Sequence, residues 1–337
     1  MRLRHLHLPS RAPSLYPPYS LASRVQEHLR RQQLDFKDSA SSASSASSAS
    51  SSHHDKTQQP PPPPPPPLAA PPPTLLSFTP LPTYTLGRRQ TSPLTAQETA
   101  RLQAPLYHYP SPSTTTTTSP NTTPPLPVSI LHSPRGGLAT YHGPGQTVLW
   151  PVLDLHSRHH KHFKVRCYSR LLEDTTIATL ASQFGLAAFT TADPGVWVRS
   201  QRQAGHEEEE AKIAALGVHL RRHVSALGTA INLSMPGAEV VDERRNPWAR
   251  FVACGLEGRT VTSVAGEVAG GDAGVGMDER GLAEKWAAEL AARIGVEGVE
   301  DVGVEEVVRL LERLVDGEEV GRGEREYVDQ ICQLETL

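Results

Sequence analysis

The chain has 337 residues, enough for two domains, but its 31 prolines and 5% aromatic content indicate long stretches that cannot build a core. A formal net charge of −3 excludes the strongly basic field typical of proteins that bind nucleic acids or anionic membranes. No apolar run approaches the length of a membrane-spanning helix. The cysteines Cys167, Cys254 and Cys332 are odd in number and widely spaced, so we expect no disulfide framework and a reducing compartment.

The N-terminal segment, residues 1–36, supports two interpretations. It is rich in arginine and nearly free of acids, a composition typical of an organelle-targeting segment. The same residues predict a first strand over residues 3–8, followed by an amphipathic helix with Leu21, Val25 and Leu29 on one face. We expect the targeting-like segment to overlap this first strand and helix.

Two low-complexity inserts interrupt the chain. Residues 37–80 combine a serine and alanine tract with a proline run over residues 60–67, and residues 111–127 are rich in threonine and proline; we expect both inserts to be disordered. The proline run prefers polyproline II geometry and is either a spacer or a docking site for an SH3-type or profilin-type partner. Residues 81–110, between the inserts, predict a short strand that ends at Gly87 and a connection.

The best-patterned region covers residues 128–316 and is followed by a C-terminal extension over residues 317–337. Apolar periodicity predicts several strands that are close in sequence, with helices before and after them. The predicted strands are 128–133, 147–155, 195–200, 211–222 and 224–235, the last broken at Gly228; the predicted helices are 170–184, 282–294 and 305–314. This order indicates a mixed α+β (α/β) domain with a largely antiparallel sheet.

The stretch RGGLATYHGPGQ, residues 135–146, lies shortly after the second insert, behind the predicted strand 128–133. It holds four glycines, although glycine is costly in regular structure because it loses much conformational freedom on folding. The cluster therefore predicts backbone that turns sharply or approaches another group closely.

Two side chains carry candidate chemistry, each with a structural alternative. Cys254, in RFVACGLEG, is either a small buried hydrophobe or, beside a cation or a base, a nucleophilic thiolate. Lys212, in EEEEAKIAALG, is either a surface lysine paired with the acidic run or a desolvated base. The second interpretation rests on its place at the start of an apolar strand that ends at Gly217, because burial lowers the pKa of a lysine.

The histidines give weaker signals. His142 lies inside the glycine-rich stretch and either hydrogen-bonds the loop or acts at a site. The run HSRHHKH, residues 156–162, has no zinc-site spacing, so we expect a solvated basic loop and no metal.

The segments RGGLATYHGPGQ, TVLWPVLDL, PGVWV, KIAALGV and ACG, in this order, resemble the lipoyl(octanoyl) transferase family. The likeness covers about residues 128–263. It implies the catalytic-domain fold of lipoate and biotin protein ligases, which is similar to class II synthetase cores. It implies transfer of an octanoyl group from octanoyl-acyl carrier protein to a lysine of a lipoyl domain.

The resemblance also implies partners and a location. The acceptors would be lipoyl domains of 2-oxoacid dehydrogenase E2 subunits and the glycine cleavage H protein, with no cofactor, nucleic acid or membrane. Homopolymer inserts are typical of eukaryotic chains, so we expect the mitochondrial, fungal-type form, located in the matrix.

Residue roles follow from the same resemblance. Cys254 would be the nucleophile that carries the acyl group as a thioester, and Lys212 would lower its pKa and act as general acid and base. Backbone amides near Cys254 would hold the oxyanion. The predicted acyl-pocket residues are Arg135, Gly136, Gly137, Leu138, Ala139, Thr140, Tyr141, His142, Ala215, Leu216, Gly217, Gly228, Thr229 and Ala230. Among them, Leu138 and Tyr141 would supply apolar wall.

The sequence also departs from the family pattern. Ala253 stands where the family has proline, Leu227 stands where it has histidine, and an acidic insert precedes Lys212. These departures keep open a catalytically inactive scaffold of the same fold, held by partners through the proline-rich insert. An ATP-dependent lipoate-protein ligase is the other alternative, although its serine and triple-glycine run is absent. A biotin ligase fits less well, because the chain has no GRGR-type loop.

Overall fold

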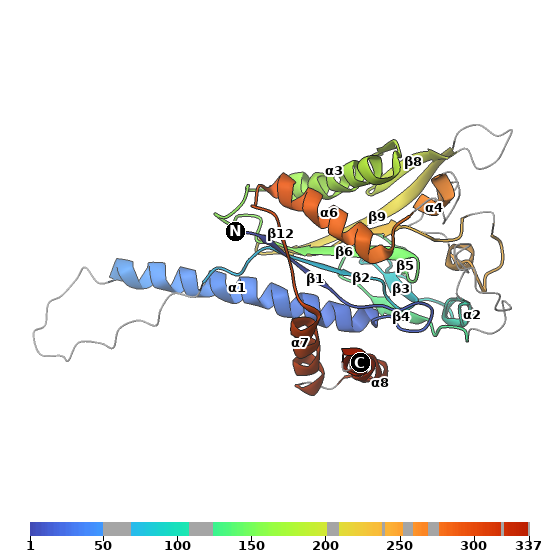
Figure 1. Ribbon diagram of the computed structural model, residues 1–337, viewed down its shortest axis with the longest axis horizontal. Helices are drawn as coiled ribbons and strands as arrows, with labels where there is room; N and C mark the ends of the chain where they lie inside the picture. The colour runs from blue at the N-terminus through green and yellow to red at the C-terminus, as the bar shows by residue number, and fades with distance from the viewer. Residues whose placement is uncertain are drawn as a thin grey trace, which may run out of the picture.

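The structure is a computed structural model, and it shows three layers: α3 and α6 on one face of a mixed sheet, and α1 with α7 on the other (Figure 1). It describes residues 1–49, 69–107, 124–200, 209–237, 240–251, 259–268, 276–317 and 320–335.

Two sheets form the β layer of the described residues. In spatial order the main sheet contains β12 (Val299–Asp301), β1 (Leu3–His7), β2 (Thr74–Phe78), β6 (Gln146–Val152), β10 (Val224–Asn232), β9 (Glu209–Arg221), β8 (Val196–Ser200) and β7 (Ala188–Phe189), with β11 (Thr260–Val261) paired to β9. The smaller sheet contains β4 (Ser129–His132), β3 (Thr83–Leu86) and β5 (Ala139–His142). In the main sheet β1 pairs in parallel with β2 and β12, and β11 with β9; the other pairs are antiparallel. The predicted α+β class with a largely antiparallel sheet is confirmed.

Two of the α-helices begin at residues whose side chains cap them. Asp278 accepts a hydrogen bond from the Gly281 amide at the start of α6, and Thr95 forms a capping box with Glu98 at the start of α2. The helical segments are α1 (Tyr19–Ala49), α2 (Ala96–Gln103), α3 (Val165–Phe184), the short 3₁₀ turn η1 (Pro247–Arg250), α4 (Val264–Glu267), α6 (Glu279–Ile294), α7 (Val304–Asp316) and α8 (Arg322–Glu335). No helix within these described ranges is long and apolar enough to cross a bilayer.

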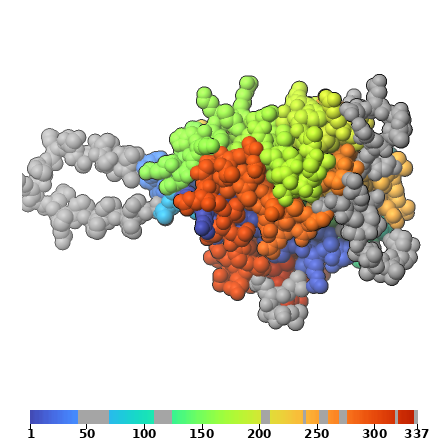
Figure 2. All heavy atoms as spheres, turned by 45° about the horizontal axis from the view of Figure 1, so that its top comes forward, coloured from blue at the N-terminus to red at the C-terminus, as the bar shows by residue number. Residues whose placement is uncertain are grey.

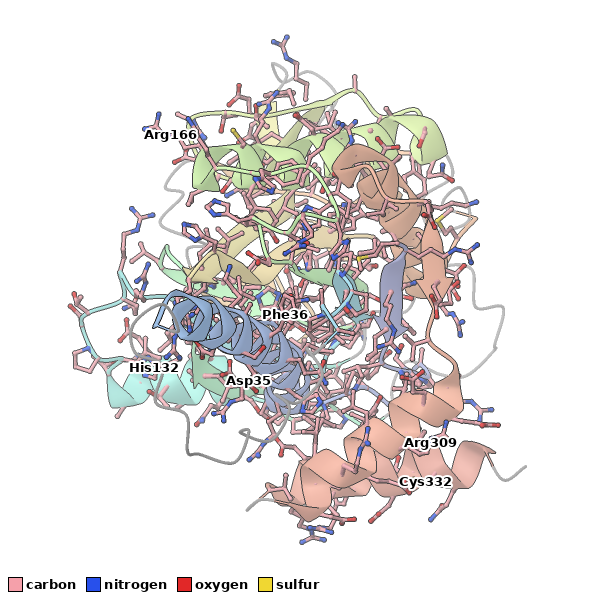
Figure 3. All side chains as sticks on the ribbon, turned by 90° about the vertical axis from the view of Figure 1, so that its left-hand side faces the viewer. Asp35, Phe36, His132, Arg166, Arg309 and Cys332 are labelled. Atoms are coloured by element: carbon pink, nitrogen blue, oxygen red, sulfur yellow. The ribbon has the colours of Figure 1, made fainter. Side chains whose placement is uncertain are left out.

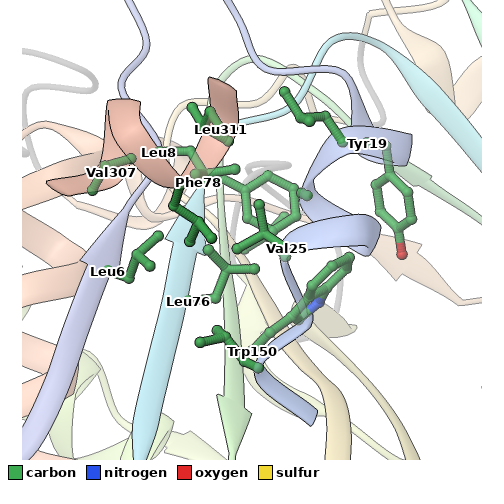
Figure 4. Close-up of a cluster of buried hydrophobic side chains, with 14 of the residues drawn as sticks. Leu6, Leu8, Tyr19, Val25, Leu76, Phe78, Trp150, Val307 and Leu311 are labelled. Carbon is green, nitrogen blue, oxygen red and sulfur yellow. The ribbon is translucent and has the colours of Figure 1, made fainter. Parts of the chain in front are cut away.

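One hydrophobic core lies between the sheet and the α1 and α7 helices (Figure 4). Leu21, Val25 and Leu29 of α1 are buried in it, so the predicted apolar face of the first helix is confirmed. Large side chains from five elements meet there: Leu6, Leu8, Tyr19, Val25, Leu76, Phe78, Trp150, Val307 and Leu311. Each such side chain contributes about 1.5–3 kcal/mol when it leaves water.

A second core lies on the opposite face, where α3 and α6 contact each other and cover the sheet (Figure 2). Trp286 of α6 is fully buried there, and its indole N–H donates to Thr176 Oγ1 of α3 at 3.0 Å. The predicted helices 170–184 and 282–294 are confirmed, although α3 begins earlier, at Val165.

The first insert is shorter than its composition predicts. Helix α1 continues through residues 37–49, and β2 lies within the range 37–80 that we expected to be disordered. Leu75 and Leu76 of β2 are fully buried between β1 and β6, because they supply core on both faces of the sheet. The expected disorder is therefore wrong for these parts. The proline run over residues 60–67, like most of the second insert, lies outside the described residues.

The C-terminal residues are part of the packed structure. Tyr327, Val328 and Ile331 of α8 are buried in the core that also contains α7. Figure 3 shows Arg309 of α7 and Cys332 of α8 on the side of the sheet opposite Arg166 of α3. The extension over residues 317–337 thus adds a helix to the core.

Candidate active site

The β9–β10 hairpin brings two predicted pocket segments face to face. Gly217 pairs with Gly228, Leu216 with Thr229, and Ala215 with Ala230. We expected strands that end or break at these glycines, but both strands continue through them. A Cβ at position 228 would lie 2.2 Å from the Leu149 carbonyl oxygen, so the close approach of β6 explains a glycine in mid-strand.

The glycine-rich stretch forms a turn and then β5. Gly137 and Gly145 have φ of +84° and +83°, which confirms the predicted sharp turns. Successive side chains of a strand point to opposite faces. Thr140 and His142 line a cavity, whereas Tyr141 packs against Tyr84 and Trp248 in a separate apolar cluster.

Two cavities lie against the β9–β10 hairpin. The outer cavity has a volume of about 690 Å³ and is lined by Arg89, Arg135, Gly136, Gly137, Arg166, Ser169, Glu173, Thr191, Ala192, Asp193, Pro194, Lys212, Ala215, Leu216, Gly217 and Val218. The inner cavity has a volume of about 30 Å³ and is lined by Tyr19, Arg135, Thr140, His142, Trp150, Ala215, Leu216, Gly217, Leu227, Gly228, Thr229 and Ala230. Of the predicted pocket residues, Leu138, Ala139 and Tyr141 line neither cavity. Each remaining predicted residue lines at least one of the cavities, and Arg135, Ala215, Leu216 and Gly217 form a shared wall because they line both.

Lys212 is buried on the wall of the outer cavity, with 7% of its surface exposed. It lies on β9 between Trp197 of β8 and Val261 of β11. Its Nζ donates to the Pro194 carbonyl at 3.1 Å and lies 4.7 Å from the centre of the Trp197 ring. The surface interpretation of this lysine is therefore wrong.

An arginine side chain lies at the same tryptophan. The guanidinium of Arg259 is 4.9 Å from the centre of the Trp197 ring and forms an ion pair with Asp193 at 2.6 Å. Cation–π contacts of this kind favour a positively charged group at the ring face. The Trp197 ring thus holds Lys212 and Arg259 on the same part of the site.

Cys254, with the neighbouring Ala253, lies outside the described residues. The described chain stops at Phe251 and resumes at Arg259. Directly after Arg259, β11 pairs with β9 at Lys212, and the Thr262 amide donates to the Lys212 carbonyl at 3.0 Å. The segment that carries Cys254 therefore ends beside Lys212. The predicted contact between the two side chains stays a prediction.

His142 belongs to a buried hydrogen-bonded chain. Gln146 Nε2 donates to Asn232 Oδ1 at 2.9 Å, so its Oε1 accepts from His142 Nδ1 at 2.8 Å. Asn232 in turn donates to the Thr262 carbonyl at 2.9 Å. This chain fixes the His142 tautomer with the proton on Nδ1, and it connects the inner cavity to the strand that follows the Cys254 segment.

Burial keeps His142 neutral. Its desolvation, reinforced by the nearby Arg135 charge, lowers the pKa of His142 to about 4, although the hydrogen bond with Gln146 opposes the shift. The ring stacks on Tyr19, with 5.3 Å between the ring centres. At neutral pH, His142 therefore presents an unprotonated Nε2.

Arg135 lines both cavities. Its guanidinium donates to the Thr85 carbonyl at 2.6 Å and to the Gly136 carbonyl at 3.0 Å. Its Cδ lies 2.8 Å from the position that a Cβ on residue 217 would occupy. A glycine at position 217 thus makes room for the arginine stem.

The sequence reasoning missed several residues that line the cavities or contact Lys212. Pro194 and Trp197 belong to PGVWV, a segment that we used for the resemblance without giving it a role. Tyr19 and Trp150 reach the inner cavity from α1 and β6, and Glu173 reaches the outer one from α3. Their sequence positions carry no signal of this, because only the packing of distant elements brings them to the site.

Two further histidine clusters do not extend the site. His156, His159 and His162 are exposed, as predicted for a solvated loop, whereas His160 is buried and hydrogen-bonds its neighbour's carbonyl. Ser77, His5 and Asp301 form a hydrogen-bonded chain of 2.8 and 2.9 Å that resembles a catalytic triad. Ser77 has no exposed surface, so the chain joins β1, β2 and β12 and offers a substrate no access.

Comparison with known proteins points to one family. The family model of the lipoyl protein ligase A/B catalytic domain matches residues 68–269. The octanoyltransferases of Rickettsia africae and Rickettsia rickettsii are 36% and 35% identical to the chain over 138 residues, which is 41% of this chain and 59% of each relative. The chain thus spans less than two thirds of the length of these relatives.

A solved bi-partite lipoate protein ligase from Thermoplasma acidophilum aligns with 95% of both chains, at 12% identity and a TM-score of 0.49. The family model covers more than half of the chain, and its match includes Lys212, the β9–β10 hairpin and the glycine-rich stretch. The chain belongs to the lipoyl protein ligase A/B catalytic domain family.

Proposed function

We propose that the chain is an octanoyltransferase that moves an octanoyl group from a thioester donor, octanoyl-acyl carrier protein, to a lysine amine of a lipoyl domain. One observation carries the proposal: the buried amine of Lys212 lies on the wall of a large cavity, beside the strand that follows the Cys254 segment. The names of the Rickettsia relatives support the same reaction.

The acyl chain would lie along the wall shared by the two cavities. Ala215, Leu216 and Gly217 form this wall, and their small or apolar side chains suit a hydrocarbon tail. The inner cavity, of about 30 Å³, has room for one or two water-sized groups, which makes it a niche for the end of the tail. Trp150 and Leu227 give this niche its apolar lining.

The reaction uses Cys254 as nucleophile. Its thiol proton passes to Lys212, which gives a thiolate and an ammonium. The thiolate attacks the octanoyl carbonyl carbon, the donor's carbon–sulfur bond breaks, and Lys212 returns the proton to the departing donor thiol. The amine of the acceptor lysine then attacks the new thioester, Lys212 takes its proton, and the Cys254 thiolate leaves. No ATP is needed, because the donor thioester is already activated.

We also propose acceptors and a location. The acceptors are lipoyl domains of 2-oxoacid dehydrogenase E2 subunits and the glycine cleavage H protein. The arginine-rich N-terminal segment supports the mitochondrial matrix, even though β1 and α1 use the same residues for the fold. Fusion of residues 1–36 to a reporter tests the location: import supports the proposal, and a reporter that stays in the cytosol contradicts it.

The direct test of the reaction is mass spectrometry. Full-length protein is incubated with octanoyl-acyl carrier protein, and we expect a mass gain of one octanoyl group on Cys254 that is lost in Cys254→Ala. Addition of a lipoyl domain should then transfer the group to its lysine. No adduct, or an adduct that survives Cys254→Ala, contradicts the proposal.

Two alternatives give different outcomes in the same assay. An ATP-dependent ligase would modify the lipoyl domain only when ATP and the free acid are present. An inactive scaffold would give neither adduct nor product, and it would not rescue a lipoylation-deficient strain.

A further inference from the structure

A single peptide bond connects Lys212 to a carboxylate that also lines the outer cavity. The carbonyl of Pro194 accepts from Lys212 Nζ at 3.1 Å. The amide N–H of Gly195, which belongs to the same peptide bond, donates to Glu173 Oε1 at 3.1 Å. The lysine and the carboxylate therefore hold the two ends of one peptide unit.

The glycine of this peptide unit has an unusual backbone conformation and lies close to the lysine. Gly195 has a φ of +123°, a conformation that side chains other than glycine rarely adopt. A Cβ on residue 195 would lie 3.4 Å from Lys212 Cε, so the peptide packs directly against the lysine stem. Because a peptide group is planar, fixing the direction of its N–H also fixes the direction of its carbonyl.

Glu173 is well placed to provide that restraint. It projects from α3, whose Leu172 and Thr176 are fully buried in the second core, and it lines the outer cavity together with Pro194 and Lys212. Burial raises the pKa of Glu173, whereas its hydrogen bond from Gly195 acts in the opposite direction. Its neighbour Asp174 instead pairs with Arg170 at 2.8 Å on the outside of the helix.

We propose that Glu173 is a positioning residue for Lys212 and acts through the Pro194–Gly195 peptide. By accepting from the Gly195 amide, the carboxylate directs the Pro194 carbonyl at the lysine amine and makes it a stronger acceptor. The amine is thereby held on the cavity wall, close to the Trp197 ring. This proposal rests on the proposed function, because it concerns how the acyl-transfer base is oriented.

The test separates the hydrogen bond from the charge. Glu173→Ala removes the acceptor, Glu173→Gln keeps an acceptor oxygen without the charge, and Asp174→Ala removes a neighbouring carboxylate that lines neither cavity. We expect Glu173→Ala to lower kcat for octanoyl transfer about tenfold with KM for the lipoyl domain nearly unchanged, the loss typical of one hydrogen bond to a charged group. Glu173→Gln and Asp174→Ala should stay near the wild-type kcat.

Equal rates for Glu173→Ala and Asp174→Ala would overturn the proposal, and so would a Glu173→Gln variant as slow as Glu173→Ala. Thermal unfolding checks each variant. If the alanine variant does not fold, Glu173→Met keeps the side-chain volume without the carboxylate and takes its place, with the same expected loss.

A second measurement does not depend on catalysis. A small amine-reactive reagent labels Lys212 and the exposed Lys285 of α6 in the same sample, and mass spectrometry gives the ratio of the two rates. We expect Glu173→Ala, but not Glu173→Gln, to raise the relative labelling of Lys212, because the amine loses its fixed partner. An unchanged ratio overturns the positioning role. If the wild-type protein transfers no octanoyl group, that result contradicts the proposed function. The labelling ratio then tests the positioning role of Glu173 on its own.

Discussion

The inner and outer cavities share one wall but differ in the rest of their lining. The inner cavity is lined by the Tyr19 and Trp150 rings and by residues of β5, β9 and β10, and its histidine is kept neutral by burial. The outer cavity is lined by arginines, acids and Lys212. Under the proposed function, the inner cavity would take the end of the hydrocarbon tail, and the outer cavity, which contains Lys212, would carry the proton transfers.

The largest expected effect lies in the outer cavity. Lys212→Ala should lower octanoyl transfer by about a hundredfold or more, the usual loss when a general acid and base is removed. The exposed Lys285→Ala is the matched control and should retain full activity. Steady-state rates of octanoyl transfer to a lipoyl domain measure the effect in both variants. A Lys212→Ala variant with the wild-type kcat would contradict a role of this cavity in proton transfer.

The inner cavity should impose a pH dependence on stability. His142 has a pKa of about 4 in the folded chain against 6.5 unfolded, so the unfolded state binds its proton first as the pH falls. The stability that comes from neutral His142 is fully present above pH 6.5 and is lost as the pH falls towards 4. The free energy of unfolding should fall by about 2 kcal/mol near pH 5 and by about 3 kcal/mol near pH 4. Urea unfolding across this range measures it.

The control for this pH effect is a variant without the histidine. His142→Asn should show a flatter loss of unfolding free energy than the wild type over the same pH range. His7, whose pKa burial lowers to about 3, contributes in the same direction in both proteins and cancels in the difference. Identical slopes would mean that His142 is not buried neutral.

Two glycine substitutions compare the strands behind the cavities. Gly228→Ala places a Cβ 2.2 Å from the Leu149 carbonyl oxygen, so we expect a loss of about 1–3 kcal/mol in unfolding free energy. Gly217→Ala meets the flexible Arg135 stem at 2.8 Å, so it should cost less stability, and it adds a methyl group where the lining of the two cavities is shared. Chemical denaturation and rates with acyl donors of increasing length measure the two effects. If both variants lose the same unfolding free energy, the two glycines are needed for strand packing alone.

The smallest effect is expected at the rim of the outer cavity. Arg89 is exposed, and within the described residues it forms no ion pair. If this rim contacts an anionic donor, Arg89→Ala should raise the KM for the donor a fewfold, about 0.5–1 kcal/mol, and leave kcat and stability unchanged. Kinetics at low and high salt measure this, since salt should remove the difference. An unchanged KM at low salt would exclude a donor contact at Arg89.

The sequence predicted the strands that hold Lys212 and the pocket hairpin, because alternating apolar residues report the buried faces of a sheet. It also placed Arg135 and His142 near Ala215 and Gly228, through motifs in a known order. It wrongly predicted that Tyr141 lines the acyl pocket, because the number of residues in the preceding turn decides which face of β5 a side chain occupies. It missed Tyr19, Trp150 and Glu173, whose places depend on how distant elements pack.

The central claim is that one acyl chain runs from Lys212 along the shared wall into the inner cavity. An octanoyl thioester with a photoreactive diazirine at the end of its tail tests this in the full-length protein. After loading and illumination, the account predicts crosslinks to residues that line the inner cavity, such as Trp150 and Leu227. Crosslinks confined to other surfaces, with both cavities unlabelled, would contradict it.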